Sequence, residues 1–142
     1  MPADFILVDG DEAVFVPAFG DALVTVLPGR IRGGGPAQAG GRNVCVQGDE
    51  GSVKVEGCPY MTPAYSVPGV GTLGIARLAG DQVAGSTESG GAPVLLRGSV
   101  FTAGFQVVTP AMTPAVPPVP DPMTSYEGEG SFITTNLEVM GS

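Results

Sequence analysis

Apolar residues along this chain occur in short runs that are separated by glycine, proline and aspartate. The runs are rich in valine, leucine, isoleucine and phenylalanine and are bounded by turn-forming residues, which is the pattern of β-strands. No stretch of about 11 residues without glycine or proline shows the spacing of three and four that an amphipathic helix requires. The pattern therefore predicts an all-β fold, with candidate strands at residues 5–8, 14–16, 23–27, 44–46, 53–55, 73–78, 94–96, 105–108 and 132–139.

One short motif occurs twice and, in a looser form, a third time. Residues 8–12 are Val-Asp-Gly-Asp-Glu, residues 46–50 are Val-Gln-Gly-Asp-Glu, and residues 78–82 are Leu-Ala-Gly-Asp-Gln. Each copy follows an apolar run, and Gly-Asp suits a tight hairpin turn because it accepts positive φ angles. Two interpretations stay open: three ordinary turns, which such dipeptides commonly form, or three similar β-units within one domain.

The distribution of proline divides the chain into three expected parts. Residues 1–109 are expected to form the β domain. Residues 110–122 hold six prolines, which favour an extended, semi-stiff linker because proline fixes φ and lacks an N–H donor. Residues 123–142 form a C-terminal tail with strand composition, which we expect to return and pair with the core or with a neighbouring chain.

The composition favours a stiff, folded chain and excludes several partners. Hydrophobic residues make up 43% of the chain, more than is usual in disordered proteins. The net charge is −8 and the six basic residues are scattered, whereas nucleic acids and anionic membranes are bound by clustered Lys and Arg. We expect no nucleic-acid partner. No apolar run approaches the roughly 20 residues of a spanning helix, and the N-terminus lacks signal-peptide features, so we expect cytoplasmic synthesis.

Residues suited to catalysis are scarce. The chain has no histidine, which removes the commonest general base and the commonest zinc ligand. The acids at Asp9, Asp11 and Glu12 are most simply solvated turn residues. Cys45 and Cys58 form no CxxC pair, and whether they are free, paired or metal-bound stays open. We therefore expect a structural protein, with no catalytic residue, cofactor or metal.

Two segments resemble a known family. Residues 44–50 (Val-Cys-Val-Gln-Gly-Asp-Glu) with 57–60 (Gly-Cys-Pro-Tyr), and residues 93–101 (Pro-Val-Leu-Leu-Arg-Gly-Ser-Val-Phe) with 107–111 (Val-Val-Thr-Pro-Ala), resemble parts of PAAR-like spike-tip proteins. These proteins belong to contractile injection systems: type VI secretion systems, extracellular injection particles and phage tails. The resemblance covers roughly residues 5–111.

The resemblance implies a small, cone-like domain of short strands with pseudo-threefold β-units. In that family the base docks on a trimeric β-helical spike, with one copy per trimer, and the point leads the spike through a target membrane, which it contacts only transiently. It also implies assembly into an injection particle, delivery outside the cell or into a target, and possible attachment of a cargo or effector.

The chain departs from the family at the point of the cone. Many PAAR tips hold a metal there with three histidines and a cysteine, a site that cannot exist in this sequence. The candidate residues for the spike interface are Tyr60, Tyr65, Phe101 and Phe105. Core packing is the alternative role for each of them, above all for Phe101 and Phe105. Two other functions stay open: a phage or capsid decoration protein that assembles symmetrically, and a carboxylate-based hydrolase.

Overall fold

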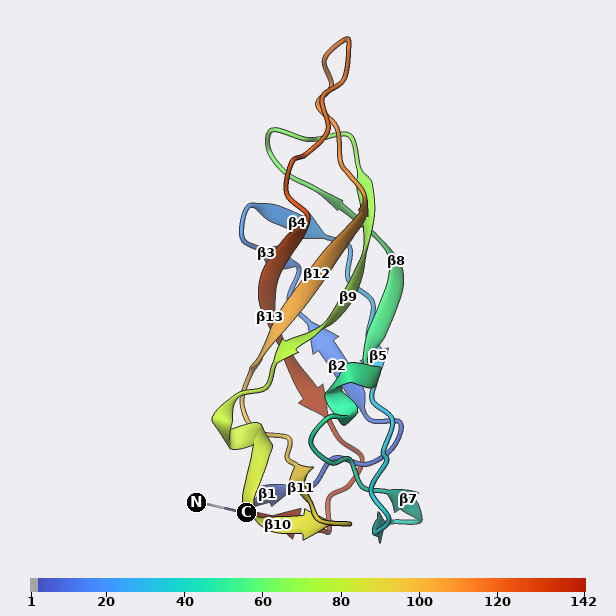
Figure 1. Ribbon diagram of the computed structural model, residues 1–142, viewed down its shortest axis with the longest axis vertical. Coiled ribbons are helices and arrows are strands. Elements are labelled where there is room, and N and C mark those ends of the chain that lie inside the picture. Colours follow the sequence, from blue (N-terminus) through green and yellow to red (C-terminus); the bar gives the residue numbers. More distant parts are fainter. Residues whose placement is uncertain (1–2) are drawn as a thin grey trace.

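The structure, a computed structural model, describes residues 3–142. Within these residues the fold is all-β, as predicted, and helical structure is limited to two 3₁₀ turns, η1 (Asp49–Ser52) and η2 (Gly80–Gln82). The body tapers from a broad end, where β1 (Asp4–Phe5) and β14 (Met140–Gly141) pair, to a point made by a single loop (Figure 1). The expected cone-like shape is confirmed.

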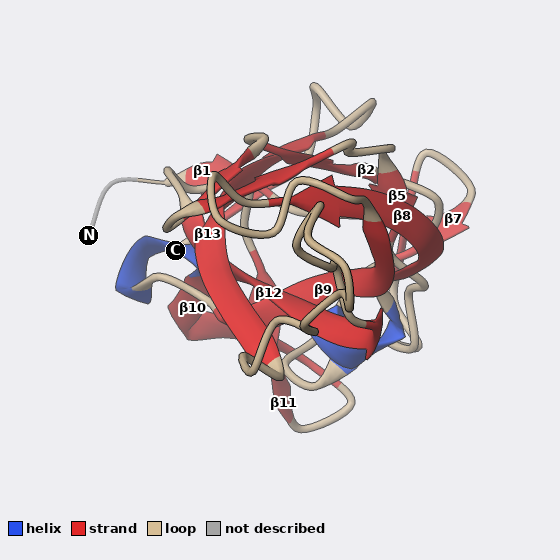
Figure 2. Cartoon of the chain, turned by 90° about the horizontal axis from the view of Figure 1, so that it is seen from above, coloured by secondary structure: helices blue, strands red, loops and turns tan. Residues whose placement is uncertain are grey.

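Eight strands form one antiparallel sheet in the order β3-β4-β8-β9-β12-β13-β2-β5. The sheet curls around a central core (Figure 2). Its strands are β2 (Glu12–Phe15), β3 (Ala18–Phe19), β4 (Ala22–Val24), β5 (Gly29–Arg30), β8 (Lys54–Met61), β9 (Gly69–Arg77), β12 (Phe101–Thr109) and β13 (Ser125–Ile133).

The core is filled by alternate residues of these strands, as expected of strands with one buried face. On β12 the side chains of Phe101, Ala103 and Phe105 are fully buried. Aromatic rings pack edge to face or tilted across the sheet: the centroids of Phe101 and Phe132 are 4.9 Å apart, and those of Phe15 and Phe101 are 5.7 Å apart.

Three two-stranded ladders form the broad end of the body (Figure 1). Two of them are closed by Gly-Gly turns with positive φ, at Gly40-Gly41 and Gly90-Gly91, the conformation that tight hairpins need. The ladders pair β1 with β14, β6 (Gln38–Ala39) with β7 (Arg42–Asn43), and β10 (Val83–Ser89) with β11 (Ala92–Leu95).

The C-terminal tail is woven into the body. Its strand β13 lies between β12 and β2 in the middle of the sheet, and β14 returns to pair with β1. The predicted strand at 132–139 is only partly correct, because β13 begins at Ser125 and ends at Ile133. This strand includes the polar sequence Glu127-Gly128-Glu129-Gly130. Both glutamates are exposed, while the glycines face neighbouring aromatic rings.

The tight packing at Gly130 leads to a first prediction. An added Cβ there would lie 2.5 Å from Phe101 Cζ and 2.6 Å from the Val14 carbonyl oxygen, whereas one at Gly85 in β10 would meet nothing within 4 Å. We expect Gly130→Ala to lower the free energy of unfolding by about 2 kcal/mol through overpacking. Gly85→Ala, the matched control, should leave it nearly unchanged or raise it slightly. Urea titration measures both, and equal effects would contradict this packing.

Candidate functional site

At the broad end, three chain segments form a closed ring: residues 6–8, residues 44–46 and residues 94–96. Their central residues are joined head to tail by backbone hydrogen bonds of 2.9 Å. The Leu7 N–H donates to the Leu95 carbonyl, the Leu95 N–H to the Cys45 carbonyl, and the Cys45 N–H to the Leu7 carbonyl. Each segment therefore has the same relation to the next, which is a pseudo-threefold arrangement within one chain.

A second set of backbone bonds repeats the same symmetry. The N–H two positions after each central residue donates to the carbonyl two positions before the centre of a neighbouring segment. These bonds run from Asp9 to Asn43 (2.8 Å), from Gln47 to Pro93 (2.9 Å) and from Arg97 to Phe5 (2.9 Å). The antiparallel bridges are also cyclic, at Val8 with Val44, Val46 with Val94, and Ile6 with Leu96. Every neighbouring pair in the ring thus exchanges two hydrogen bonds.

The ring lies between two apolar layers. The central side chains of Leu7, Cys45 and Leu95 are fully buried in the main core under the curled sheet. The flanking residues point away from them into a separate cluster, formed by Ile6, Val8, Ala39, Val44, Ala84, Val94 and Leu96. Packing on both sides fixes the ring, because neither layer can be displaced without exposing buried apolar area.

The three ladders repeat the symmetry at their outer strands. Phe5 pairs with Met140, Asn43 with Gln38, and Pro93 with Glu88. The outer partners Gln38, Glu88 and Met140 are all exposed, and the residues that follow them, Ala39, Ser89 and Gly141, are all small and buried. We call Gln38, Glu88 and Met140 the rim positions. The three outer strands thus place their rim positions at equivalent points of the register.

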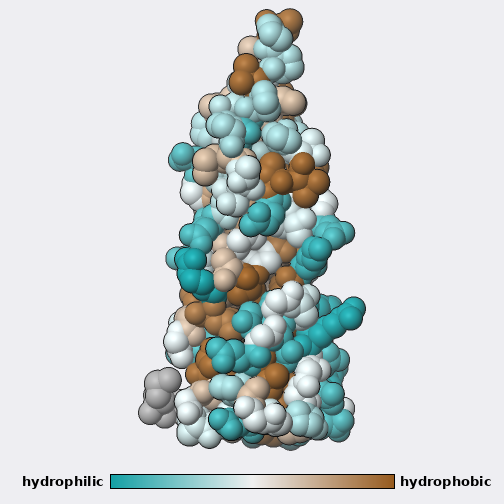
Figure 3. Space-filling model, viewed as in Figure 1, coloured by the Kyte–Doolittle hydropathy of each residue, from teal (hydrophilic) through white to brown (hydrophobic). Residues whose placement is uncertain are grey.

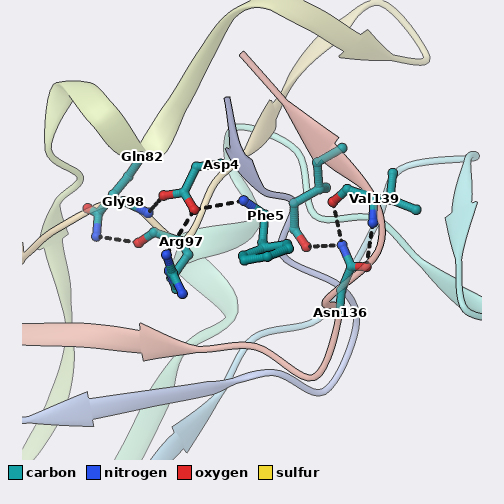
Figure 4. Close-up of polar contacts among 8 residues, drawn as sticks. Asp4, Phe5, Gln82, Arg97, Gly98, Asn136 and Val139 are labelled. Carbon is teal, nitrogen blue, oxygen red and sulfur yellow. Dashed lines mark hydrogen bonds and ion pairs between the residues drawn. The ribbon is translucent and has the colours of Figure 1, made fainter. Parts of the chain in front are cut away.

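Side chains fasten the first segment of the ring to the third and to the tail (Figure 4). The Asp4 carboxylate accepts the Gly98 N–H at 2.8 Å and pairs with the Arg97 guanidinium at 3.2 Å. The Asn136 amide nitrogen donates to the carbonyls of Ile6 at 2.9 Å and Val139 at 2.8 Å. These bonds hold the ladder between β1 and β14, which has no connecting turn of its own.

The sequence repeat located two of the three units correctly. The turns after the first and second segments are alike: the Asp11 carboxylate accepts the Val8 N–H, and the Asp49 carboxylate accepts the Val46 N–H, both at 2.8 Å. The loose third copy at 78–82 is not a ring segment. It is a neighbouring turn, in which the Gln82 carbonyl accepts the Leu96 N–H.

The third ring segment is instead followed by Gly98. Gly10, Gly48 and Gly98 all have positive φ and follow the three segments at the same distance. A pattern of three apolar residues, one further residue and glycine occurs at Ile6–Gly10, Val44–Gly48 and Val94–Gly98, and it would have identified all three units.

A buried carboxylate closes the base of the point. We call residues 112–120, which leave β12 and return towards β13, the point loop. Asp121 is 5% exposed, and its carboxylate accepts the hydroxyls of Tyr60 at 2.9 Å and Tyr126 at 2.6 Å and the Met123 N–H at 3.0 Å. The Tyr60 oxygen accepts the Ala111 N–H at 3.0 Å. Both ends of the loop are therefore tied to one network.

The network changes the acidity of its members. Burial alone would raise the pKa of Asp121, but hydrogen bonds from Tyr126, Met123 and Tyr60 hold it below its usual value. Burial and the neighbouring Asp121 carboxylate raise the pKa of both tyrosines. At neutral pH the carboxylate is thus the acceptor and the hydroxyls are the donors, which is the arrangement that the distances require.

Three of the four candidate interface residues are core residues. Tyr60 is 1% exposed and Phe101 and Phe105 are fully buried, so their side chains offer no area to a partner in this fold. The ring centroids of Tyr60 and Phe105 are 5.1 Å apart. Tyr65 is half-buried against the main core, and its contact with a spike stays a prediction. The rim positions could not be predicted from the sequence, because they become equivalent only through the pairing register of the three ladders.

The two cysteines are separate, buried and unpaired. Burial, followed by the nearby Asp49, Asp11 and Asp9, raises the pKa of Cys45, and burial raises that of Cys58. Both are therefore protonated thiols at neutral pH. Among residues 3–142, no group of three or more Cys, Asp and Glu side chains is placed to hold a metal.

The Asp121 network leads to a second prediction. In Asp121→Asn an amide N–H₂ must face one of the three donors, so we expect the free energy of unfolding to fall by about 2 kcal/mol. Glu138→Gln, which makes the same change at an exposed residue, should have no measurable effect. Thermal and urea unfolding at neutral pH measure both variants, and an unchanged Asp121→Asn would refute the network.

The sign of the pH dependence gives a third prediction. The folded pKa of Asp121 lies below its unfolded value, so its contribution to stability is complete above a pH of about 4 and is lost as the pH falls through the folded pKa. The wild-type protein should lose this contribution on acidification, and Asp121→Asn should not. The difference in stability between the two proteins should therefore shrink at low pH, and a constant difference would contradict the assignment.

No helix among the described residues is long and apolar enough to cross a membrane.

The comparisons with known proteins agree with the geometry of the ring and the tapered body. No curated protein matches the sequence. The family model described as contractile injection system spike tip protein matches residues 1–142. This chain, with its tapered all-β body, therefore belongs to the family of spike-tip proteins of contractile injection systems.

Proposed function

We propose that the broad end of this protein caps the end of a trimeric spike, with one copy per trimer, while the point faces outward. Family membership implies a structural role in association with the spike protein and assembly into a secreted particle. The observation that supports the finer proposal is the ring of residues 6–8, 44–46 and 94–96, which gives a single chain three segments with the same backbone pairing.

Symmetry explains why such a ring is useful. A trimer ends in three identical surfaces, and a monomer without internal symmetry could match only one of them. Three similar ladders within one chain can meet all three surfaces at once. The cap would also cover the terminal strand edges of the spike, which are otherwise prone to pair with other chains.

The rim positions are the residues through which we expect contact. Gln38, Glu88 and Met140 lie at equivalent places on the three outer strands and are all exposed. Their chemistry differs, so the three contacts are similar in geometry and unequal in strength. We propose that the backbone edges supply the common fit and that the rim side chains supply selectivity.

The shape and the packing fit the work of puncturing a membrane. The ring lies between two apolar clusters, and the ends of the point loop are tied to Asp121. Such a body deforms little, because close-packed interiors have low compressibility. Attachment of a cargo or effector stays a prediction from the family.

The closed ring disfavours the alternative function, a decoration protein that assembles as a trimer. The threefold ring closes within one chain, so the symmetry does not require two further copies. A monomer that binds a trimer is the simpler arrangement.

This proposal gives a fourth prediction. Native mass measurement of the purified chain mixed with its spike should show one copy bound per spike trimer. The triple variant Gln38→Arg, Glu88→Arg, Met140→Arg should bind at least about tenfold more weakly, because three arginines must be accommodated in the contact.

The matched control is Gln106→Arg, Glu56→Arg, Thr25→Arg. It makes the same change in charge at exposed residues of the flank and should bind as the wild type does. Three copies per trimer, or equal loss in both triple variants, would refute capping by the broad end.

A further inference from the structure

The three outer strands at the broad end are not all joined to one another. Between β6 and β10, the N–H of Ala37, which precedes β6, donates to the Ser89 hydroxyl oxygen at 3.0 Å. Between β10 and β14, the Thr87 N–H donates to the main-chain oxygen of Ser142, and the Ser142 N–H donates to the Thr87 hydroxyl oxygen, both at 3.0 Å. Two of the three junctions are therefore closed by hydrogen bonds.

The third junction, between β6 and β14, is open. The register of the ladders makes Ala39 the counterpart of Ser89, and alanine has no side-chain acceptor. Threefold symmetry would bring Val139 to Ala39, but the Val139 N–H donates to the Asn136 amide oxygen at 3.0 Å. Within residues 3–142, no hydrogen bond joins β6 to β14.

The glycines of the two hairpin turns show the same difference. Gly40 and Gly90 are the first glycines of these turns, and both have positive φ. A Cβ at Gly90 would lie 2.9 Å from Pro36 Cδ in the neighbouring unit, whereas one at Gly40 would meet nothing within 4 Å. The turn between β10 and β11 is therefore packed against its neighbour, and the turn between β6 and β7 is not.

A pocket lies at the open junction. Its volume is about 410 Å³, within the range of roughly 300–1,000 Å³ that is typical of binding sites. One wall is the β6–β7 hairpin, with Ala39, Gly40 and Arg42, and the other is the tail before β14, with residues 135–138. The Asn136 amide holds the tail wall in place, because it donates to two main-chain carbonyls (Figure 4).

The two walls of the pocket carry opposite charges. Arg42 on the hairpin wall and Glu138 on the tail wall are both exposed, and neither belongs to an ion pair within residues 3–142. The guanidinium can only donate hydrogen bonds and the carboxylate can only accept them. An extended main chain carries both carbonyl and N–H groups along its edges. It therefore complements a donor wall and an acceptor wall at the same time.

The pocket is continuous with the rim. The rim position Gln38 directly precedes the hairpin wall, and the rim position Met140 follows the tail wall. Polar and apolar side chains are mixed over the broad end on the face that Figure 3 shows. A partner that covers this end must therefore match polar groups as well as bury apolar ones, and a partner on the rim positions also reaches the pocket.

We infer that an extended segment of one spike chain enters this pocket, so that one chain of the trimer is held differently from the other two. The inference rests on the proposed function and makes the cap asymmetric, because the trimer offers three copies of the segment and the tip has a single open junction. Arg42 donates to carbonyl oxygens of the segment and Glu138 accepts its N–H groups. The segment also covers Leu137, which is 68% exposed.

Two pairs of variants test the pocket. Thr135→Trp adds bulk at an exposed residue of the lining, and Thr25→Trp makes the same change on the flank. Arg42→Glu replaces the donor with an acceptor, and its control is Arg32→Glu, because Arg32 is also exposed and in no ion pair within residues 3–142. Calorimetric titration with the spike trimer should show Thr135→Trp and Arg42→Glu binding at least about tenfold more weakly than the wild type. Both controls should bind as the wild type does.

Hydrogen exchange of the spike tests the asymmetry. The spike trimer is labelled in heavy water with and without the bound tip, for times shorter than the lifetime of the complex. With the wild-type tip, we expect the terminal peptide of the spike to split into two mass envelopes, one protected chain for every two less protected chains, because only one chain gains hydrogen bonds in the pocket. With Thr135→Trp at saturation, the protected envelope should be lost.

Three results would overturn the inference: wild-type affinity in Thr135→Trp, wild-type affinity in Arg42→Glu, or a single mass envelope for the three chains. Each of them leaves capping intact as long as one copy still binds per trimer. Failure of the wild-type tip to bind, or three copies per trimer, refutes capping and this inference with it. Urea titration of each variant separates loss of binding from loss of folding.

Discussion

The cyclic backbone pairing of residues 6–8, 44–46 and 94–96 is the constraint on which the rest of this structure depends. Six main-chain hydrogen bonds join these three segments and the residues that flank them, which are far apart in the sequence. Each such bond contributes only about 1 kcal/mol net, but each buried group left without a partner costs about as much or more. The ring therefore forms as a whole. Once it has formed, the ladders at the broad end and the curled sheet on its other side both have a fixed foundation.

The two ends of the body are built in different ways. The broad end repeats one geometry three times, with a small buried residue at Ala39, Ser89 and Gly141 and an exposed residue before each. The point is a single loop whose two ends meet at Asp121. A buried carboxylate with three hydrogen-bond donors holds this place. Proline and apolar side chains then complete the point without charge.

The sequence predicted the class of fold and much of the strand content, because β-branched runs bounded by glycine and proline are local signals. It could not predict β13, whose buried face contains Gly128 and Gly130 and whose glutamates face water; only the positions of Phe19 and Phe101 explain those glycines. The Gly-Asp motif marks only two of the three ring units, because Gly98, which follows the third ring segment, is followed by serine. The sequence offers Tyr60 as a candidate for the spike interface or the core, and its hydroxyl donates to Asp121, which is distant in sequence. Long-range pairing of this kind leaves no local pattern.

An electron cryomicroscopy map of the chain assembled on its spike tests the central claim most directly. The account predicts one copy at the spike end, with the ring of residues 6–8, 44–46 and 94–96 centred on the threefold axis of the spike and the point loop directed away from it. A map with the point loop against the spike, or with several copies arranged around the axis, would contradict it.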